Sequence, residues 1–141
     1  MTENTEYVAG RCNIGSMEIA QRRRIGFIGL AITGFGVIIY IFSVLSLNIS
    51  PFIGFLFIFP TSMAAIGFIQ ARKKFCAAYG FSSVANVSVQ LGVTVKIQNE
   101  IERKKDRNKA IIISIQSILI GVIGTIILMV LGFLVQQSID V

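Results

Sequence analysis

The two cysteines, Cys12 and Cys76, are the side chains best suited to chemistry in this chain, because the sequence contains no histidine. Two thiolates supply half of the ligands of a tetrahedral zinc site, so metal or redox chemistry would require a second chain. A buried cysteine without a reactive partner behaves as a small apolar side chain. We expect this role for both residues and keep thiol or metal chemistry as an alternative.

The elements that must position these thiols are membrane-spanning helices. Residues 25–71 and 110–139 contain no Asp, Glu, Lys or Arg. About 20 residues at roughly 1.5 Å each cross a hydrocarbon core of about 30 Å, so the longer stretch holds two spans and the shorter holds one. Ser50 and Pro51 suit the start of a helix. We therefore predict spans over about 25–47, 51–70 and 110–135, with a kink in the second span at Pro60.

The composition agrees with this interpretation. The chain has 141 residues, of which 54% are hydrophobic and 14% are charged. Disorder requires low hydrophobicity and high charge, and a soluble domain needs polar helix faces that these segments lack. We predict an all-α membrane protein, divided into an N-terminal segment (1–24), a helical hairpin (25–71), a basic loop (72–109), and a third span with a short tail (110–141).

The positive charges predict the orientation of the spans. All 13 Lys and Arg residues lie in 1–24 or 72–109, which three spans place on the same side of the membrane. The positive-inside rule then predicts a multi-pass protein of the cell membrane with a cytoplasmic N-terminus and an external C-terminus. A cleavable signal peptide fits poorly, because the charged leader and the apolar run that follows are both long.

The spans contain small residues at helix-packing spacing and no ionisable residue. This argues against a proton-coupled transporter, a proton relay or a voltage sensor. We expect the hydroxyl groups of the spans to bond to nearby carbonyls or across helices. Close packing within the bundle, or against a second copy or a partner subunit, is predicted at Gly29, Thr33, Gly36, Ala64, Gly67, Ser117, Gly121 and Thr125.

The basic loop alternates apolar and other residues from 87 to 97, which is a strand period. A short β-hairpin with Gly92 in its turn is one interpretation, and an irregular loop with a helix from Thr94 is the other. Residues 99–109 read as a helix leading into the third span, with ion pairs Glu100–Lys104 and Asp106–Lys109 at helical spacing.

The N-terminal segment is predicted to dock beneath the bundle. Ser16 can cap a helix that has Glu18 in its first turn and runs on into the first span. Cys12 then lies before this helix, at about the depth at which Cys76 follows the second span. We therefore expect residues 10–15 to pack against residues 75–81.

The excess of basic residues has two interpretations. One is a topological signal with ordinary solvation, and the other is attraction to anionic lipid headgroups, at about 1 kcal/mol per Lys or Arg near the surface. Nucleic-acid binding is not expected, because the cluster lies against an equally anionic membrane. The candidate lipid-contacting residues are Arg22, Arg23, Arg24, Arg72, Lys73, Lys74, Arg103, Lys104 and Lys105.

Several short strings resemble a group of small prokaryotic membrane proteins with no assigned activity. They are GRCNIG at 10–15, Glu18-Ile19, RRR at 22–24, GFIQA at 67–71, FCAAYG at 75–80 and DRNKA at 106–110. The resemblance covers most of the chain and implies three spans, but it implies no cofactor or catalytic residue.

These observations favour a non-enzymatic accessory or structural subunit that contacts anionic lipids and a membrane-protein partner or a second copy of itself, with no cofactor. One alternative is binding or handling of a lipid or small hydrophobic molecule at the inner leaflet. The other is the thiol or metal chemistry of Cys12 and Cys76.

Overall fold

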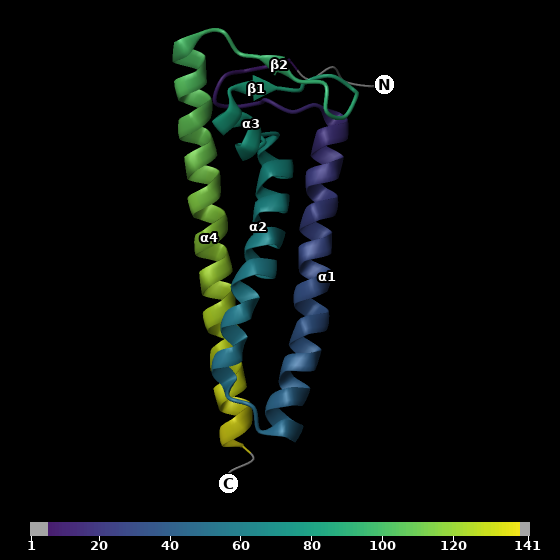
Figure 1. The fold of residues 1–141 in the computed structure, drawn as a ribbon, viewed down its shortest axis with the longest axis vertical. Coiled ribbons are helices and arrows are strands. Elements are labelled where there is room, and N and C mark those ends of the chain that lie inside the picture. The colour runs from purple at the N-terminus through teal and green to yellow at the C-terminus, as the bar shows by residue number, and fades with distance from the viewer. Residues whose placement is uncertain (1–5, 139–141) are drawn as a thin grey trace.

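Three long helices run side by side in the computed structural model, which describes residues 6–138 (Figure 1). They are α1 (Ser16–Leu47), α2 (Ile58–Lys73) and α4 (Glu100–Gln137), and a 3-10 helix, η1 (Pro51–Phe57), precedes α2. Between α2 and α4 lie a short helix, α3 (Ala77–Ser82), and two strands, β1 (Val84–Ala85) and β2 (Val95–Lys96). α1, η1 together with α2, and α4 are each apolar and long enough to span a membrane, which confirms the predicted fold class.

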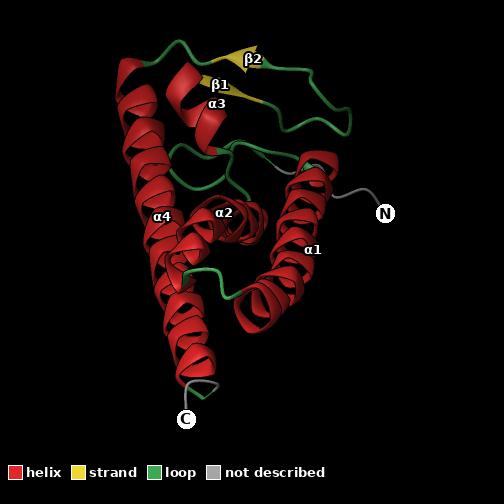
Figure 2. Cartoon of the chain, turned by 60° about the horizontal axis from the view of Figure 1, so that its bottom comes forward, coloured by secondary structure: helices red, strands yellow, loops and turns green. Residues whose placement is uncertain are grey.

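α2 lies between α1 and α4 and contacts both (Figures 1 and 2). Gly67 meets the backbone of Gly26, and Gly29 meets the backbone of Ala64, so neither contact leaves space for a Cβ atom. On the other face of α2, Ser62 occupies the space beside Gly121. Small residues thus bring the helices close within one bundle, where lipid supplies no hydrophobic drive.

Several hydroxyl groups of the spans bond to backbone carbonyls, as predicted. Thr33 Oγ1 donates to the Gly29 carbonyl over 2.8 Å, and Thr125 Oγ1 donates to the Gly121 carbonyl over 2.8 Å. Thr61 Oγ1 bonds to carbonyls of its own helix segment and lies 3.2 Å from the carbonyl of Gly121 across the helix contact. Most of these bonds therefore stay within one helix.

The second span differs from the prediction of one continuous helix with a central kink. Its first seven residues form η1, and α2 begins only at Ile58. Pro60 therefore lies in the first turn of α2, where N–H groups have no intrahelical partner, and the departure from α-helical geometry precedes it. Pro51 occupies the first turn of η1 as predicted, whereas Ser50 makes no capping hydrogen bond through its side chain.

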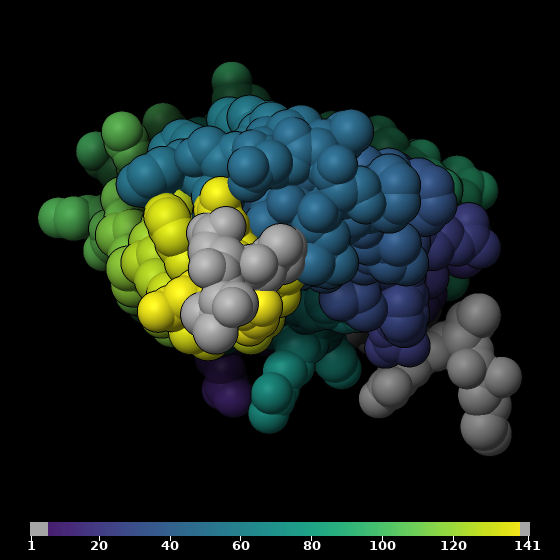
Figure 3. Space-filling model, turned by 90° about the horizontal axis from the view of Figure 1, so that it is seen from below, coloured from purple at the N-terminus to yellow at the C-terminus, as the bar shows by residue number. Residues whose placement is uncertain are grey.

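Figure 3 shows the end of the bundle that lies away from the two strands. There the end of α4 (yellow) lies against η1 (blue). Phe52 of η1 and Phe133 of α4 pack edge to face with ring centroids 5.2 Å apart. Nearby, the Tyr40 hydroxyl takes the space beside Gly132, so α1 also contacts α4 at this end.

The basic loop forms the predicted hairpin, but with other boundaries. β1 and β2 are antiparallel, pairing Val84 with Lys96 and Ala85 with Val95. The ladder ends at Ala85 because the next residue, Asn86, instead forms a parallel bridge with Ile14 of the N-terminal segment. The alternative is right in that residues 87–94 are irregular, but its helix from Thr94 is wrong, since α4 begins at Glu100.

One predicted feature of the helix starts is wrong. Gly15, and not Ser16, is the N-cap of α1, and α1 has no side-chain capping bond. α4 is capped by the Asn99 side chain, which accepts from the backbone N–H of Ile101.

Candidate functional site

The end of the bundle that carries the basic loop is closed by a small cap, formed by residues 6–18 and 74–109 (Figure 2). Its interior contains polar side chains beside apolar ones such as Ile14 and Phe75. Among the residues that the structure describes, the two buried acidic side chains, Glu18 and Asp106, both lie in the cap. Asn13 and Asn86 of the cap are buried as well. A buried polar group is costly unless it is hydrogen-bonded, so the partners of these four side chains define the site.

Glu18 accepts hydrogen bonds from three different parts of the cap. The Tyr79 hydroxyl donates to Oε1 over 2.8 Å, and Asn86 Nδ2 donates over 3.1 Å. The backbone N–H of Gly92, in the hairpin loop, donates to the same oxygen over 3.2 Å. The Arg22 guanidinium group lies 3.4 Å from Oε2, and this contact is the one ion pair found within residues 6–138. One carboxylate therefore joins α1, α3 and the hairpin.

The charge of Glu18 is stable at neutral pH. Burial opposes ionisation, but the hydrogen bonds from Tyr79, Gly92 and Asn86 and the charge of Arg22 outweigh it and lower the pKa of Glu18. Burial and the adjacent Glu18 carboxylate raise the pKa of Tyr79 to about 12. Neither group has a pKa near neutrality, so the pair is suited to holding the cap together and not to proton transfer.

Asn13 attaches the N-terminal segment to the end of α2. Its Nδ2 donates to the Cys76 carbonyl over 3.1 Å, and its Oδ1 accepts from the Cys76 N–H over 2.7 Å. The backbone of Asn13 also bonds to Lys74 and to Asn86. The predicted docking of residues 10–15 against residues 75–81 is confirmed at this contact.

Asp106 attaches the same segment to α4. The Tyr7 hydroxyl donates to Oδ2 over 3.0 Å, and the Gly10 N–H donates to Oδ1 over 2.6 Å. Burial and the Asp106 carboxylate raise the pKa of Tyr7. The predicted pair of Asp106 with Lys109 is therefore wrong, because the carboxylate is turned toward the N-terminal segment. The predicted Glu100–Lys104 pair is likewise not formed within the described residues.

Both cysteines are buried and unoxidised. The Cys12 thiol points to the carbonyl of Ile14, at 3.6 Å. Burial raises the pKa of the Cys76 thiol, which disfavours the reactive thiolate. No group of three Cys, Asp or Glu residues that could hold a metal ion occurs in residues 6–138. These surroundings are those of packed side chains.

A basic pocket of about 560 Å³ opens between the N-terminal segment, the end of α2 and Lys109 of α4. Five cationic side chains and a single acidic one line it. Lys73 also donates to Gln116 Oε1 over 2.6 Å, which ties its ammonium group to α4. The lining residues are Glu6, Val8, Arg11, Cys12, Arg72, Lys73, Lys74 and Lys109.

The other predicted lipid-contacting residues lie outside this pocket. Arg22 pairs with Glu18 and lies over the ring of Tyr79, 5.8 Å from its centroid. Arg103 and Lys104 line a separate pocket of about 290 Å³ together with Arg107. The remaining three, Arg23, Arg24 and Lys105, are exposed. The nine residues therefore do not form one site, and Arg11 and Lys109, which the sequence interpretation missed, join the largest group.

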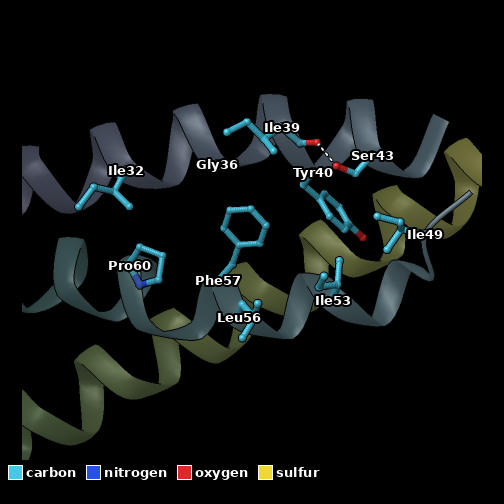
Figure 4. Close-up of a pocket in the computed structure, with 10 residues that line it drawn as sticks. All are labelled: Ile32, Gly36, Ile39, Tyr40, Ser43, Ile49, Ile53, Leu56, Phe57 and Pro60. Carbon is cyan, nitrogen blue, oxygen red and sulfur yellow. Dashed lines mark hydrogen bonds between the residues drawn. The ribbon is translucent and has the colours of Figure 1, made fainter. Parts of the chain in front are cut away.

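An apolar pocket of about 290 Å³ lies at the other end of the bundle, between α1 and η1 (Figure 4). Phe57 and Tyr40 project into the space between the two elements, and Gly36 leaves room for the ring of Phe57. The Tyr40 hydroxyl is bound to the carbonyl of Pro51 at 2.9 Å. The pocket therefore offers apolar contact and few free polar groups.

No protein-family model, no curated protein and no solved structure matches this chain.

Proposed function

We propose that this chain is an integral membrane protein whose cap lies on the cytoplasmic side and binds anionic lipid headgroups in the basic pocket. The supporting observation is the gathering of Arg11, Arg72, Lys73, Lys74 and Lys109 around one opening, where Glu6 is the one acidic neighbour among the described residues. The proposal selects lipid binding from the alternatives that the sequence leaves open and assigns it no enzymatic step.

The position of the pocket suits this role. Arg72 directly follows the second apolar stretch, and Lys109 directly precedes the third. Both residues therefore belong at the level of the headgroups. Attraction to an anionic leaflet amounts to about 1 kcal/mol per Lys or Arg near the surface, so several cations at one opening act together.

A thermal-stability measurement tests the proposal. The full chain in a neutral detergent should melt at a higher temperature when dioleoylphosphatidylglycerol is added, and less so with dioleoylphosphatidylcholine, because a ligand that binds only the folded state stabilises it. The triple variant Arg11→Gln/Lys74→Gln/Lys109→Gln should weaken this lipid affinity at least tenfold. A matched triple variant, Arg24→Gln/Lys96→Gln/Lys105→Gln, removes equal charge outside the pocket. Equal losses in both variants would contradict the proposal.

Cysteine labelling tests the orientation. A cysteine introduced at Ser138, in a variant with Cys12 and Cys76 replaced by serine, should react with an impermeant maleimide only from outside the cell. Labelling from the cytoplasmic side alone would contradict the three-span topology. The expectation rests on the positive-inside rule.

A second candidate function, an accessory or structural subunit, is favoured by apolar side chains that lie outside the spans. Leu91, Val93 and Val95 of the hairpin are 49%, 47% and 68% exposed. Exposed apolar patches beyond the bilayer mark protein contacts, and within the described residues only one edge of β2 is paired. A partner that copurifies in stoichiometric amount should be lost in Val93→Ser/Val95→Ser and retained in Lys96→Gln. Retention of the partner in the serine variant would contradict this role.

A further inference from the structure

A groove between α1 and α2 carries two arginines at one end and two phenylalanines at the other. Arg23, Phe27, Phe68, Ala71 and Arg72 line this groove, which has a volume of about 410 Å³. Arg23 and Phe27 are four residues apart on α1, and Phe68 and Arg72 are four residues apart on α2. Residues at this spacing lie on one helix face, so each helix presents an arginine one turn from a phenylalanine.

The two helices are antiparallel, and the residue pairs match in depth. Arg23 lies just before the first apolar stretch, and Arg72 directly after the second. One helical turn is about 5.4 Å, so each phenylalanine lies that far into the apolar region below its arginine. The rings of Phe27 and Phe68 pack edge to face, with centroids 5.1 Å apart. The groove therefore changes from cationic to aromatic at the membrane boundary.

The charge of the groove is available to a ligand. Among the residues that the structure describes, no acidic side chain lines it. Within residues 6–138 neither Arg23 nor Arg72 forms an ion pair, whereas the adjacent Arg22 is bound to Glu18. A guanidinium group can donate two parallel hydrogen bonds to a phosphate, so two of them facing one groove favour a phosphate diester over a neutral ligand.

We infer that the groove binds one anionic glycerophospholipid, with its phosphate between Arg23 and Arg72 and an acyl chain along Phe27 and Phe68. Phe27 is 57% exposed, which leaves its ring available to the chain. The inference rests on the proposed function in that both place anionic lipid at this end of the bundle. It depends on other side chains, because only Arg72 is shared with the basic pocket.

Native mass spectrometry of the full chain in a neutral detergent tests this site. When dioleoylphosphatidylglycerol is titrated, the first lipid molecule should bind at a lower lipid concentration than any further molecule. Arg23→Gln should weaken that first binding step at least tenfold. Arg24→Gln is the matched control, since it removes the same charge from the next residue, which does not line the groove. Similar losses in both variants would overturn the inference in favour of general charge attraction.

The aromatic half of the groove has its own test. Phe68→Ala should weaken binding of the same lipid, whereas Phe59→Ala, at a 73% exposed phenylalanine on the same helix, should leave it unchanged. Glycerol 3-phosphate, which has no chains, should not bind measurably. If it binds as tightly as the lipid, the groove is a phosphate site and the inference is wrong. Circular dichroism and the melting temperature show whether each variant is folded, and Arg23→Lys, which keeps the charge, provides a second variant with an intermediate expected loss.

The outcome for the groove is distinguishable from that for the basic pocket. If Arg11→Gln/Lys74→Gln/Lys109→Gln loses lipid affinity but Arg23→Gln does not, the proposed function holds and the groove inference fails. If only Arg23→Gln and Phe68→Ala lose affinity, the groove is the lipid site and the pocket proposal fails.

Discussion

The spans and the cap are held together by opposite means. In the spans, Gly67 and Gly29 allow α1 and α2 to approach until their backbones touch, and hydroxyl groups bond mostly to carbonyls of their own helix. In the cap, buried polar side chains join parts of the chain that are far apart in sequence. Asn13 binds residue 76, 63 positions away, and Tyr7 binds Asp106, 99 positions away.

The difference shows which atoms specify each region. Helix contacts in lipid depend on side-chain atoms being absent, because close approach supplies the attraction. The cap depends on particular donors and acceptors being present, because each unpaired buried group costs about 1–3 kcal/mol. Added volume should therefore harm the spans most, and a deleted polar group should harm the cap most.

The largest effect is expected for Glu18→Ala. The substitution leaves the Tyr79 hydroxyl, the Asn86 amide and the Gly92 N–H without their acceptor, and Arg22 without its partner. Breaking a buried charged network of this kind costs about 3–5 kcal/mol. Denaturant unfolding in detergent micelles should show the loss in the free energy of unfolding.

Glu100→Ala is the control for this variant, because Glu100 is exposed at the start of α4. It should cost at most about 1 kcal/mol, through the helix dipole. Equal losses at Glu18 and Glu100 would mean that the buried network does not stabilise the cap.

A smaller loss is expected for Gly121→Leu in the third span. The new side chain meets Ser62 of α2, and overpacking of this kind costs roughly 1–3 kcal/mol. The comparison variant is Ile126→Leu, at a side chain that is 54% exposed and faces lipid, where little change should follow. The same unfolding assay checks both, and equal tolerance would remove the role of small residues in the bundle.

Acid should loosen the cap before it affects the spans. The pKa of Glu18 is lower in the folded protein than in the unfolded chain, so its contribution to stability is complete above its ordinary value of 4.5 and is lost as pH falls through the folded value. Hydrogen exchange at the Gly92 amide should therefore accelerate, relative to that at neighbouring exposed amides, only below about pH 4.5. Protection that is unchanged at pH 3 would contradict this linkage.

The smallest effect is expected for Ser117→Ala. The buried Ser117 hydroxyl donates to the Ile113 carbonyl of its own helix over 2.8 Å, and that carbonyl keeps its helical partner when the hydroxyl is removed. Hydrogen bonds of side chains within membranes average about 0.6 kcal/mol. A loss above 2 kcal/mol in the unfolding assay would show that polar groups specify the spans as well.

The spans could be predicted from sequence because lipid imposes one rule on every residue in them. A chain segment without charges must satisfy its backbone internally, so hydropathy alone predicts a helix. The 3-10 helix at the start of the second span was not predicted, because neither Pro51 nor Pro60 distinguishes a 3-10 turn from an α-helical one.

The cap could be predicted only in outline. Sequence spacing paired Asp106 with Lys109, three residues on, because local partners are the ones a sequence displays. Its true partners, Tyr7 and Gly10, lie 99 and 96 residues away. Likewise, apolar alternation predicted the hairpin but not its register, which depends on the pairing of Asn86 with Ile14. The residue type alone does not show that Glu18 or Asn13 is buried, because burial depends on contacts with distant parts of the chain.

The bond between Gly10 and Asp106 has a consequence for biogenesis. Residues 7–10 are synthesised early, yet their acceptor is made only after the first two spans. The cap can close only if both hydrophilic segments have remained on the same side of the membrane. If the basic loop crossed the membrane and the N-terminal segment did not, Gly10 and Asp106 would lie on opposite sides. Closure of the cap therefore distinguishes molecules with the correct topology from those without it at the end of synthesis.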